Sequence, residues 1–94
     1  MFVVIGENLR EWNKTDPVYE KHRAHMVAHI EAHDFLVSGP RAGGGSVIVA
    51  LGNDETALQA ILDKDPLVTD GFMAFTVHPF VPGLHDPAVE LEFV

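Results

Sequence analysis

This chain has no cysteine, few basic residues and no apolar run long enough to cross a bilayer. Without cysteine it has no disulfide, no thiolate nucleophile and no cysteine-type zinc site. The chain has six basic and 14 acidic residues, and its formal net charge of −8 is repelled by phosphate backbones and anionic membranes. We therefore expect neither nucleic acid nor a membrane as a partner. The apolar N-terminus is too short for a signal peptide, so we expect a cytoplasmic protein.

The 94 residues are enough for one domain, and 47% of them are apolar, with a mean hydropathy of +0.11. A domain of this size buries only about 60–65% of the surface that its unfolded chain exposes. Self-association is the simplest way to cover the remaining apolar surface, so a homodimer is expected.

The apolar runs and turn residues predict six elements in the order β-α-β-β-α-β. The predicted strands are Phe2–Ile5, Phe35–Ser38, Ser46–Leu51 and Phe72–Phe80. One helix begins at Asp16-Pro17 and runs to about His33; the other begins at Asn53 or Asp54, runs to about Lys64 and is ended by Pro66. This order predicts an α+β, ferredoxin-like βαββαβ fold, in which two helices cover a four-stranded antiparallel sheet.

The residues between and after these elements are predicted to be irregular. Gly6–Thr15 is polar and predicts a loop, and Arg41–Gly45 predicts a flexible connection between two strands. Residues 83–94 form a tail rich in proline and glycine, in which Val89–Phe93 could add a short strand or a dimer contact. The sequence contains no internal repeat and no second domain.

Four of the six histidines, His22, His25, His29 and His33, recur at helical spacing and form one stripe roughly 80° wide. Imidazole binds metals and transfers protons, so the stripe suggests chemistry. However, the last three histidines extend about 12 Å along the helix axis and cannot all bind one ion. We expect no metal. The alternative is a packing face shared with Met26 and Ile30, with at least one histidine at a cavity or subunit boundary.

Three other motifs have ordinary structural interpretations. Asp65 precedes a proline that ends a helix, and this position alone could account for it. Ser38-Gly39-Pro40 is a strand-ending turn without the context of a nucleophilic serine. Gly43–Gly45 lacks the lysine and the strand-to-helix setting of a phosphate-binding loop.

Several segments, taken in order, resemble the YCII-related domain family. They are Met1–Ile5, Glu20–Ala24 opening a helix that leads to Ser38-Gly39-Pro40-Arg41, Ala60–Val68, and Val77–Phe80. The resemblance covers about residues 1–82. The sequence departs from the family pattern at His25, His29 and His33, where relatives carry apolar, aromatic or glycine residues, and His33 replaces a helix-ending glycine.

The resemblance implies a fold of the dimeric α/β-barrel type, a homodimer formed through the sheet, and a pocket built around one histidine and one aspartate. These residues map to His22 and Asp65. His25 and His29, which share the stripe with His22, and the Ser38-Gly39-Pro40 turn are further candidates for contact with a small-molecule substrate; the extra histidines could hydrogen-bond an anionic intermediate or relay the proton. A carboxylate-held imidazole is a general base, and the implied activity is a cofactor-independent lyase or isomerase acting on a small carbonyl or phenolic compound.

Two further functions remain open from the sequence. A non-catalytic homodimer could use the same pocket to bind a small ligand or could act as an accessory to an enzyme. A metal-dependent hydrolase built on the histidine stripe is the third alternative.

Overall fold

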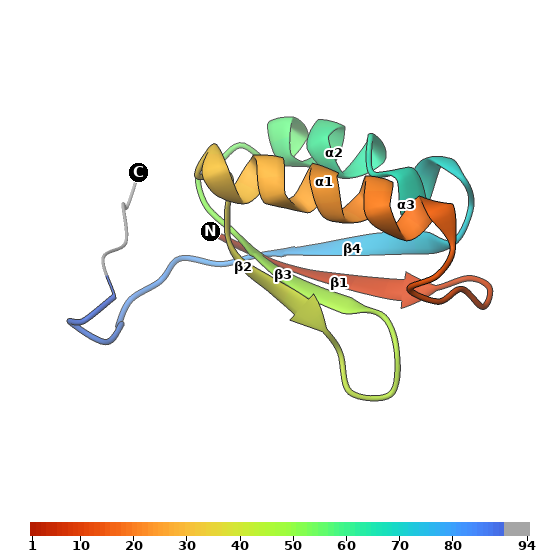
Figure 1. The fold of residues 1–94 in the computed structure, drawn as a ribbon. Coiled ribbons are helices and arrows are strands. Elements are labelled where there is room, and N and C mark those ends of the chain that lie inside the picture. The colour runs from red at the N-terminus through yellow and green to blue at the C-terminus, as the bar shows by residue number, and fades with distance from the viewer. Residues whose placement is uncertain (90–94) are drawn as a thin grey trace.

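The computed structural model describes residues 1–89 as a single sheet with its helices gathered on one face (Figure 1). The elements are β1 (Phe2–Asn8), α1 (Pro17–Glu31), β2 (Phe35–Pro40), β3 (Ser46–Ala50), α2 (Glu55–Asp63), α3 (Pro66–Thr69) and β4 (Met73–Pro79).

The four strands lie in the order β2-β3-β1-β4, and every neighbouring pair is antiparallel. This arrangement confirms the predicted α+β, ferredoxin-like fold. It adds one element that the pattern did not predict, the short helix α3. Pro66 ends α2 as expected, but it also begins α3, because the fixed φ of proline suits the first turn of a helix.

Alternation along the strands directs one set of side chains toward the helices. The main core joins the sheet to α1 and α2 and contains Phe2, Val4, Met26, Phe35, Ile48, Ala50, Leu58 and Leu62. A second cluster, Val18, Leu67 and Met73, joins the beginning of α1 to α3 and β4. This second cluster fixes α3 against α1.

Helix α1 ends at Glu31, two residues earlier than the pattern predicted. His33 has a φ of 62°, in the left-handed region. Its backbone N–H donates to the carbonyl of Ile30, and the N–H of Asp34 donates to that of His29. These two bonds form a Schellman motif, in which the left-handed position is usually glycine. His33 therefore occupies the turn that ends the helix and does not belong to its face.

Other boundaries and packing predictions also need correction. Strand β1 continues to Asn8, into the segment predicted as a loop, because it pairs with β4 along its whole length. Ile30, which the sequence placed on a possible packing face with Met26, is exposed. Val89 lies in an exposed bend, and the rest of the strand suggested at Val89–Phe93 lies outside the described residues. Within residues 1–89 no helix combines the length and apolar character needed to span a bilayer.

Candidate functional site

A histidine and an aspartate from different helices meet between α1 and α3. The Nδ1 atom of His22 lies 2.9 Å from Oδ1 and 2.8 Å from Oδ2 of Asp65, although the two residues are 43 positions apart in the sequence. A carboxylate only accepts hydrogen bonds, so the proton of the imidazole is on Nδ1. The ring is thereby held in one orientation and one tautomer.

Asp65 is held by the start of α3. It is the N-cap of that helix, and its Oδ1 accepts the backbone N–H of Leu67 at 2.9 Å. Its own backbone N–H donates to the carbonyl of Leu62, at the end of α2. The side chain is 1% exposed, so the carboxylate is removed from water and depends on these partners. The Asp-Pro step thus places a buried carboxylate at a fixed point.

His22 lies on the side of α1 that faces a cavity of about 270 Å³. Its side chain is 14% exposed, and no residue among 1–89 bonds to its Nε2 atom. Nε2 therefore has no partner among these residues and is available to a molecule in the cavity. The complete lining is Trp12, Lys14, Tyr19, His22, Arg23, Met26, Ser38, Gly39, Pro40, Gly45, Ser46 and Met73.

One wall of the cavity is aromatic. The rings of Trp12 and Tyr19 are stacked, with centroids 5.9 Å apart and planes at 24°. The indole N–H of Trp12 donates to Oδ1 of Asn8 at 2.9 Å, which fixes the plane of the indole. The indole centroid lies 6.5 Å from that of the His22 imidazole. A flat apolar surface therefore stands directly beside the imidazole.

The predicted turn residues Ser38, Gly39 and Pro40 do line the cavity, on the side opposite α1. Strand register explains this: Ser38 pairs with Ile48, and Pro40 pairs with Ser46, on the face of the sheet that carries the helices. The structure thus brings the turn and His22 to one space.

His25 and His29, the other predicted substrate contacts, are not part of the cavity lining. The Nε2–H of His25 donates to the carbonyl of Ile61 in α2 at 3.0 Å, and burial lowers the pKa of this histidine. The Nδ1 atom of His29 lies 2.8 Å from Asp34, beyond the end of α1. His25 is rotated from His22 by about 60° around α1, and His29 lies about 10 Å further along the helix axis, so these residues face other neighbours. Their predicted contact with substrate has no support from this placement.

Several lining residues were not predicted, and part of the signal was present in the sequence. Tyr19, His22 and Met26 recur at spacings of three and four, and Arg23 lies four residues after Tyr19, which is the pattern of one helix face. Trp12 and Lys14 lie on the preceding loop, where no periodicity applies. Among residues 1–89 no three histidine, aspartate or glutamate side chains gather as metal ligands.

Neither family models nor curated proteins show a match to this sequence. Among solved structures, the fold of this protein is similar to that of 5-chloro-2-hydroxyhydroquinone dehydrochlorinase (TftG) from Burkholderia phenoliruptrix, solved in complex with 2,5-dihydroxybenzoquinone. The TM-score is 0.61 at 19% sequence identity, over 85% of this chain and 93% of the other. The two proteins share a fold. This likeness agrees with the predicted ferredoxin-like architecture.

Proposed function

We propose that this protein is a small cofactor-independent enzyme of the lyase or isomerase class, with His22 as its general base. The observation that carries the proposal is the buried Asp65 carboxylate bound to Nδ1 of His22, which leaves Nε2 available at a cavity. In such a pair the carboxylate fixes the tautomer and stabilises the imidazolium that forms when Nε2 takes a proton.

The proposed step is proton abstraction next to a carbonyl or phenolic carbon of a small cyclic substrate. Nε2 of His22 takes the proton, and the electron pair left behind forms a new double bond. In an elimination, formation of this double bond expels a leaving group as an anion. In an isomerisation, His22 returns the proton to another carbon. A positioned general base contributes about 10²–10⁴-fold to such a rate. The similar structure, TftG, is a dehydrochlorinase, and loss of HCl is an elimination of this type.

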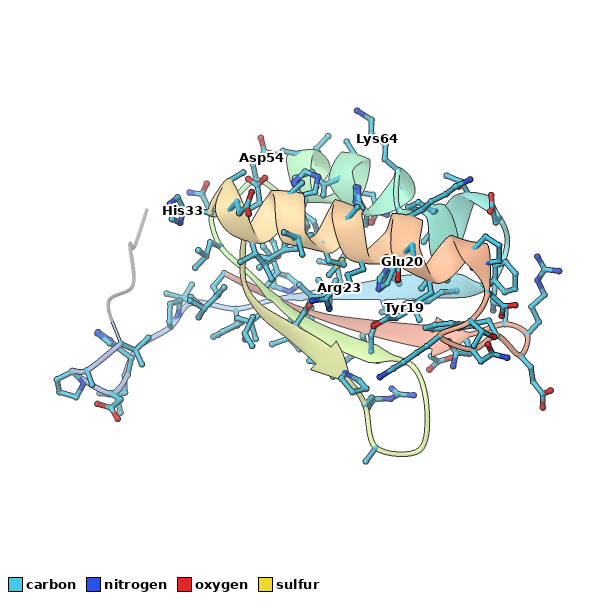
Figure 2. All side chains as sticks on the ribbon, viewed as in Figure 1. Tyr19, Glu20, Arg23, His33, Asp54 and Lys64 are labelled. Atoms are coloured by element: carbon cyan, nitrogen blue, oxygen red, sulfur yellow. The ribbon has the colours of Figure 1, made fainter. Side chains whose placement is uncertain are left out.

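A neutral elimination probe tests the role of His22 before any natural substrate is known. 5-Nitrobenzisoxazole opens to a coloured phenolate when a base removes its ring proton, and the cavity should accelerate this reaction above buffer. His22→Ala should return the rate to that of buffer. His33→Ala is the matched control, because His33 is exposed beyond the far end of α1, away from the cavity (Figure 2). Unchanged turnover in His22→Ala would contradict the proposal.

The Asp65→Asn variant tests the orienting role separately. Asparagine can present its amide N–H to Nδ1, which would favour the tautomer protonated on Nε2 and abolish the base. Nitrogen-15 chemical shifts of the His22 ring should show Nδ1–H in the wild type and a shift toward Nε2–H in the variant. A correct tautomer without acceleration of the probe would favour the alternative, a non-catalytic protein that binds a small ligand in the same cavity.

We also propose that two copies associate through the face of the sheet that the helices leave open (Figure 1). Strand register puts a group of aliphatic side chains on that face, namely Val3, Ile5, Val37, Val47 and Val49. Val37 is 53% exposed in the single chain. Burying such a patch against its own symmetry copy removes apolar surface from water without requiring a second protein.

Sedimentation or light scattering tests this association. The wild type should have twice the chain mass of 10.3 kDa. Val49→Lys places a charge in the middle of the patch and should give monomers, whereas Leu84→Lys should not, because Leu84 is 97% exposed outside the sheet. A monomeric wild type, or a Val49→Lys variant that remains dimeric, would contradict the proposed interface.

A further inference from the structure

The charge around the cavity is opposite in sign to that of the chain. The charged side chains in its lining are Lys14 and Arg23, and none of the aspartates and glutamates of residues 1–89 lines it. The chain as a whole has 14 acidic and six basic residues. Asp65 lies behind His22, where its carboxylate is bound by the imidazole. A molecule in the cavity therefore meets positive charge from a protein with a net charge of −8.

Neither cation forms an ion pair with another residue of the described part of the chain, residues 1–89. The ion pairs among residues 1–89 are His22–Asp65 and His29–Asp34, and no side-chain hydrogen bond involves Lys14 or Arg23. Arg23 and Tyr19 extend from α1 toward the sheet, whereas Lys64 lies on the outer side of the helical layer (Figure 2). Hydrogen bonds from a charged donor to a charged acceptor are about twice as strong as neutral ones. An anion in this cavity would find two such donors.

The remaining walls suit a flat ring. The Trp12–Tyr19 stack is held in place by the bond to Asn8, and the thioether side chains of Met26 and Met73 complete the apolar lining. Flat apolar surfaces bind rings by stacking, and thioethers make favourable contacts with aromatic groups. The same wall places a stacked ring beside the imidazole of His22.

We infer that the ligand of this cavity is a planar ring carrying an ionised acid group, a carboxylate or a phenolate. Its ring packs against Trp12, and its anion is bound by Arg23 and Lys14. This assignment rests on the proposed function, because it names the substrate class of the same site. It also gives the cations a chemical role: proton abstraction by His22 adds negative charge to the ring, and the same cations stabilise that charge as it develops.

A matched pair of probes tests the charge requirement. Gentisate and gentisamide share a ring and both hydroxyl groups, and they differ in a carboxylate against a neutral amide. Their dissociation constants can be followed by the indole N–H resonance of Trp12, the chain's single tryptophan and a residue of the cavity wall. Gentisate should bind at least about tenfold more tightly, since bonds to charged groups contribute about 1.5–3 kcal/mol.

Variants locate the anion site. Arg23→Gln should weaken gentisate by about tenfold or more and leave gentisamide unchanged, with a smaller effect in the same direction for Lys14→Gln. Lys64→Gln is the control, because it removes an equal charge from an exposed site outside the cavity lining. Equal affinity for both probes, no binding of either, or an equal loss in Lys64→Gln would overturn the inference.

These outcomes are separable from those of the proposed function. The benzisoxazole probe is neutral, and the tautomer of His22 is measured without ligand, so both tests are independent of anion binding. Probe turnover that depends on His22, together with equal affinity for gentisate and gentisamide, would refute the substrate class alone.

Discussion

Replacing Asp65 with alanine should destabilise this protein more than replacing its other aspartate cap. Asp54 and Asp65 each cap a helix by accepting a backbone N–H, at 3.0 Å from Ala57 and at 2.9 Å from Leu67. Asp54 is exposed, and its carboxylate has this bond alone among residues 1–89, whereas Asp65 is 1% exposed and its carboxylate also binds His22. Each substitution therefore removes one helix cap of the same kind, but only the substitution of Asp65 also removes a contact with the imidazole.

The magnitudes follow from these contacts. Loss of an N-cap costs about 1 kcal/mol, which is the expected effect of Asp54→Ala. Asp65→Ala removes a cap and also leaves the Nδ1–H of His22 unpaired in a largely buried setting, which adds about 1.5–3 kcal/mol. The total of about 2.5–4 kcal/mol is a large part of the roughly 5–14 kcal/mol expected for 94 residues.

Urea unfolding followed by circular dichroism, at one pH and one protein concentration, measures both effects. A double-mutant cycle with His22→Leu and Asp65→Ala isolates the pair, and its coupling energy should be about 1.5–3 kcal/mol. The reasoning would be refuted if Asp65→Ala cost no more than Asp54→Ala, or if the coupling were near zero while the m-values stayed equal.

Three further predictions concern single residues. His33→Gly should stabilise the chain by about 1 kcal/mol in the same urea assay, because His33 has a φ of 62° and glycine adopts that conformation without strain; a loss of stability would contradict this. Gly45→Ala should unfold at much lower urea than Gly43→Ala, since both have positive φ but an added Cβ at Gly45 would collide with the carbonyl of Gly6; equal effects would contradict it. Burial lowers the pKa of His25 in the folded chain. As the pH falls below about 6.5, the unfolded chain therefore binds more protons at this residue than the folded chain does, and the free energy of unfolding declines. Between pH 7.5 and 5.5 the His25→Gln variant should therefore lose less free energy of unfolding than the wild type, and an equal loss would contradict the assignment.

The fold was predictable because its signals are local. Strand residues are apolar and β-branched, the helices begin at aspartates, and the order of elements restricts the topology to few choices. The predicted ends of β1 and α1 were wrong because these ends depend on tertiary contacts and backbone conformation, which the sequence of one segment does not indicate. Strand β1 reaches Asn8 because β4 lies beside it. His33 ends α1 in a left-handed conformation that glycine usually adopts, so the residue type did not indicate the end of the helix.

The candidate site was only partly predictable. Periodicity grouped four histidines, but the structure directs His22, His25 and His29 to three different partners. Asp65 could be connected to His22 through the family resemblance, not through spacing, because 43 residues separate them. Lys14 lines the cavity from the loop between β1 and α1, where no periodic pattern predicts which way a side chain points. The positive lining of the cavity is therefore a property of the fold and is invisible in a composition that is strongly acidic.

The Asp65→Asn variant distinguishes a purely structural role of Asp65, as a helix cap, from a role in orienting His22. A capping residue needs only one oxygen near a backbone N–H, and it ordinarily remains in water, as Asp54 does. Burying a carboxylate is costly unless its oxygens are bound, so a cap alone gives no reason to place Asp65 at 1% exposure against another helix. Asparagine caps helices about as well as aspartate, and in Asp65→Asn it would keep the bond to Leu67. A purely structural Asp65 would therefore tolerate asparagine, whereas a residue that orients a base would not. Asp65→Asn should thus remain folded and lose turnover of the benzisoxazole probe, and retention of full turnover would reduce Asp65 to a helix cap.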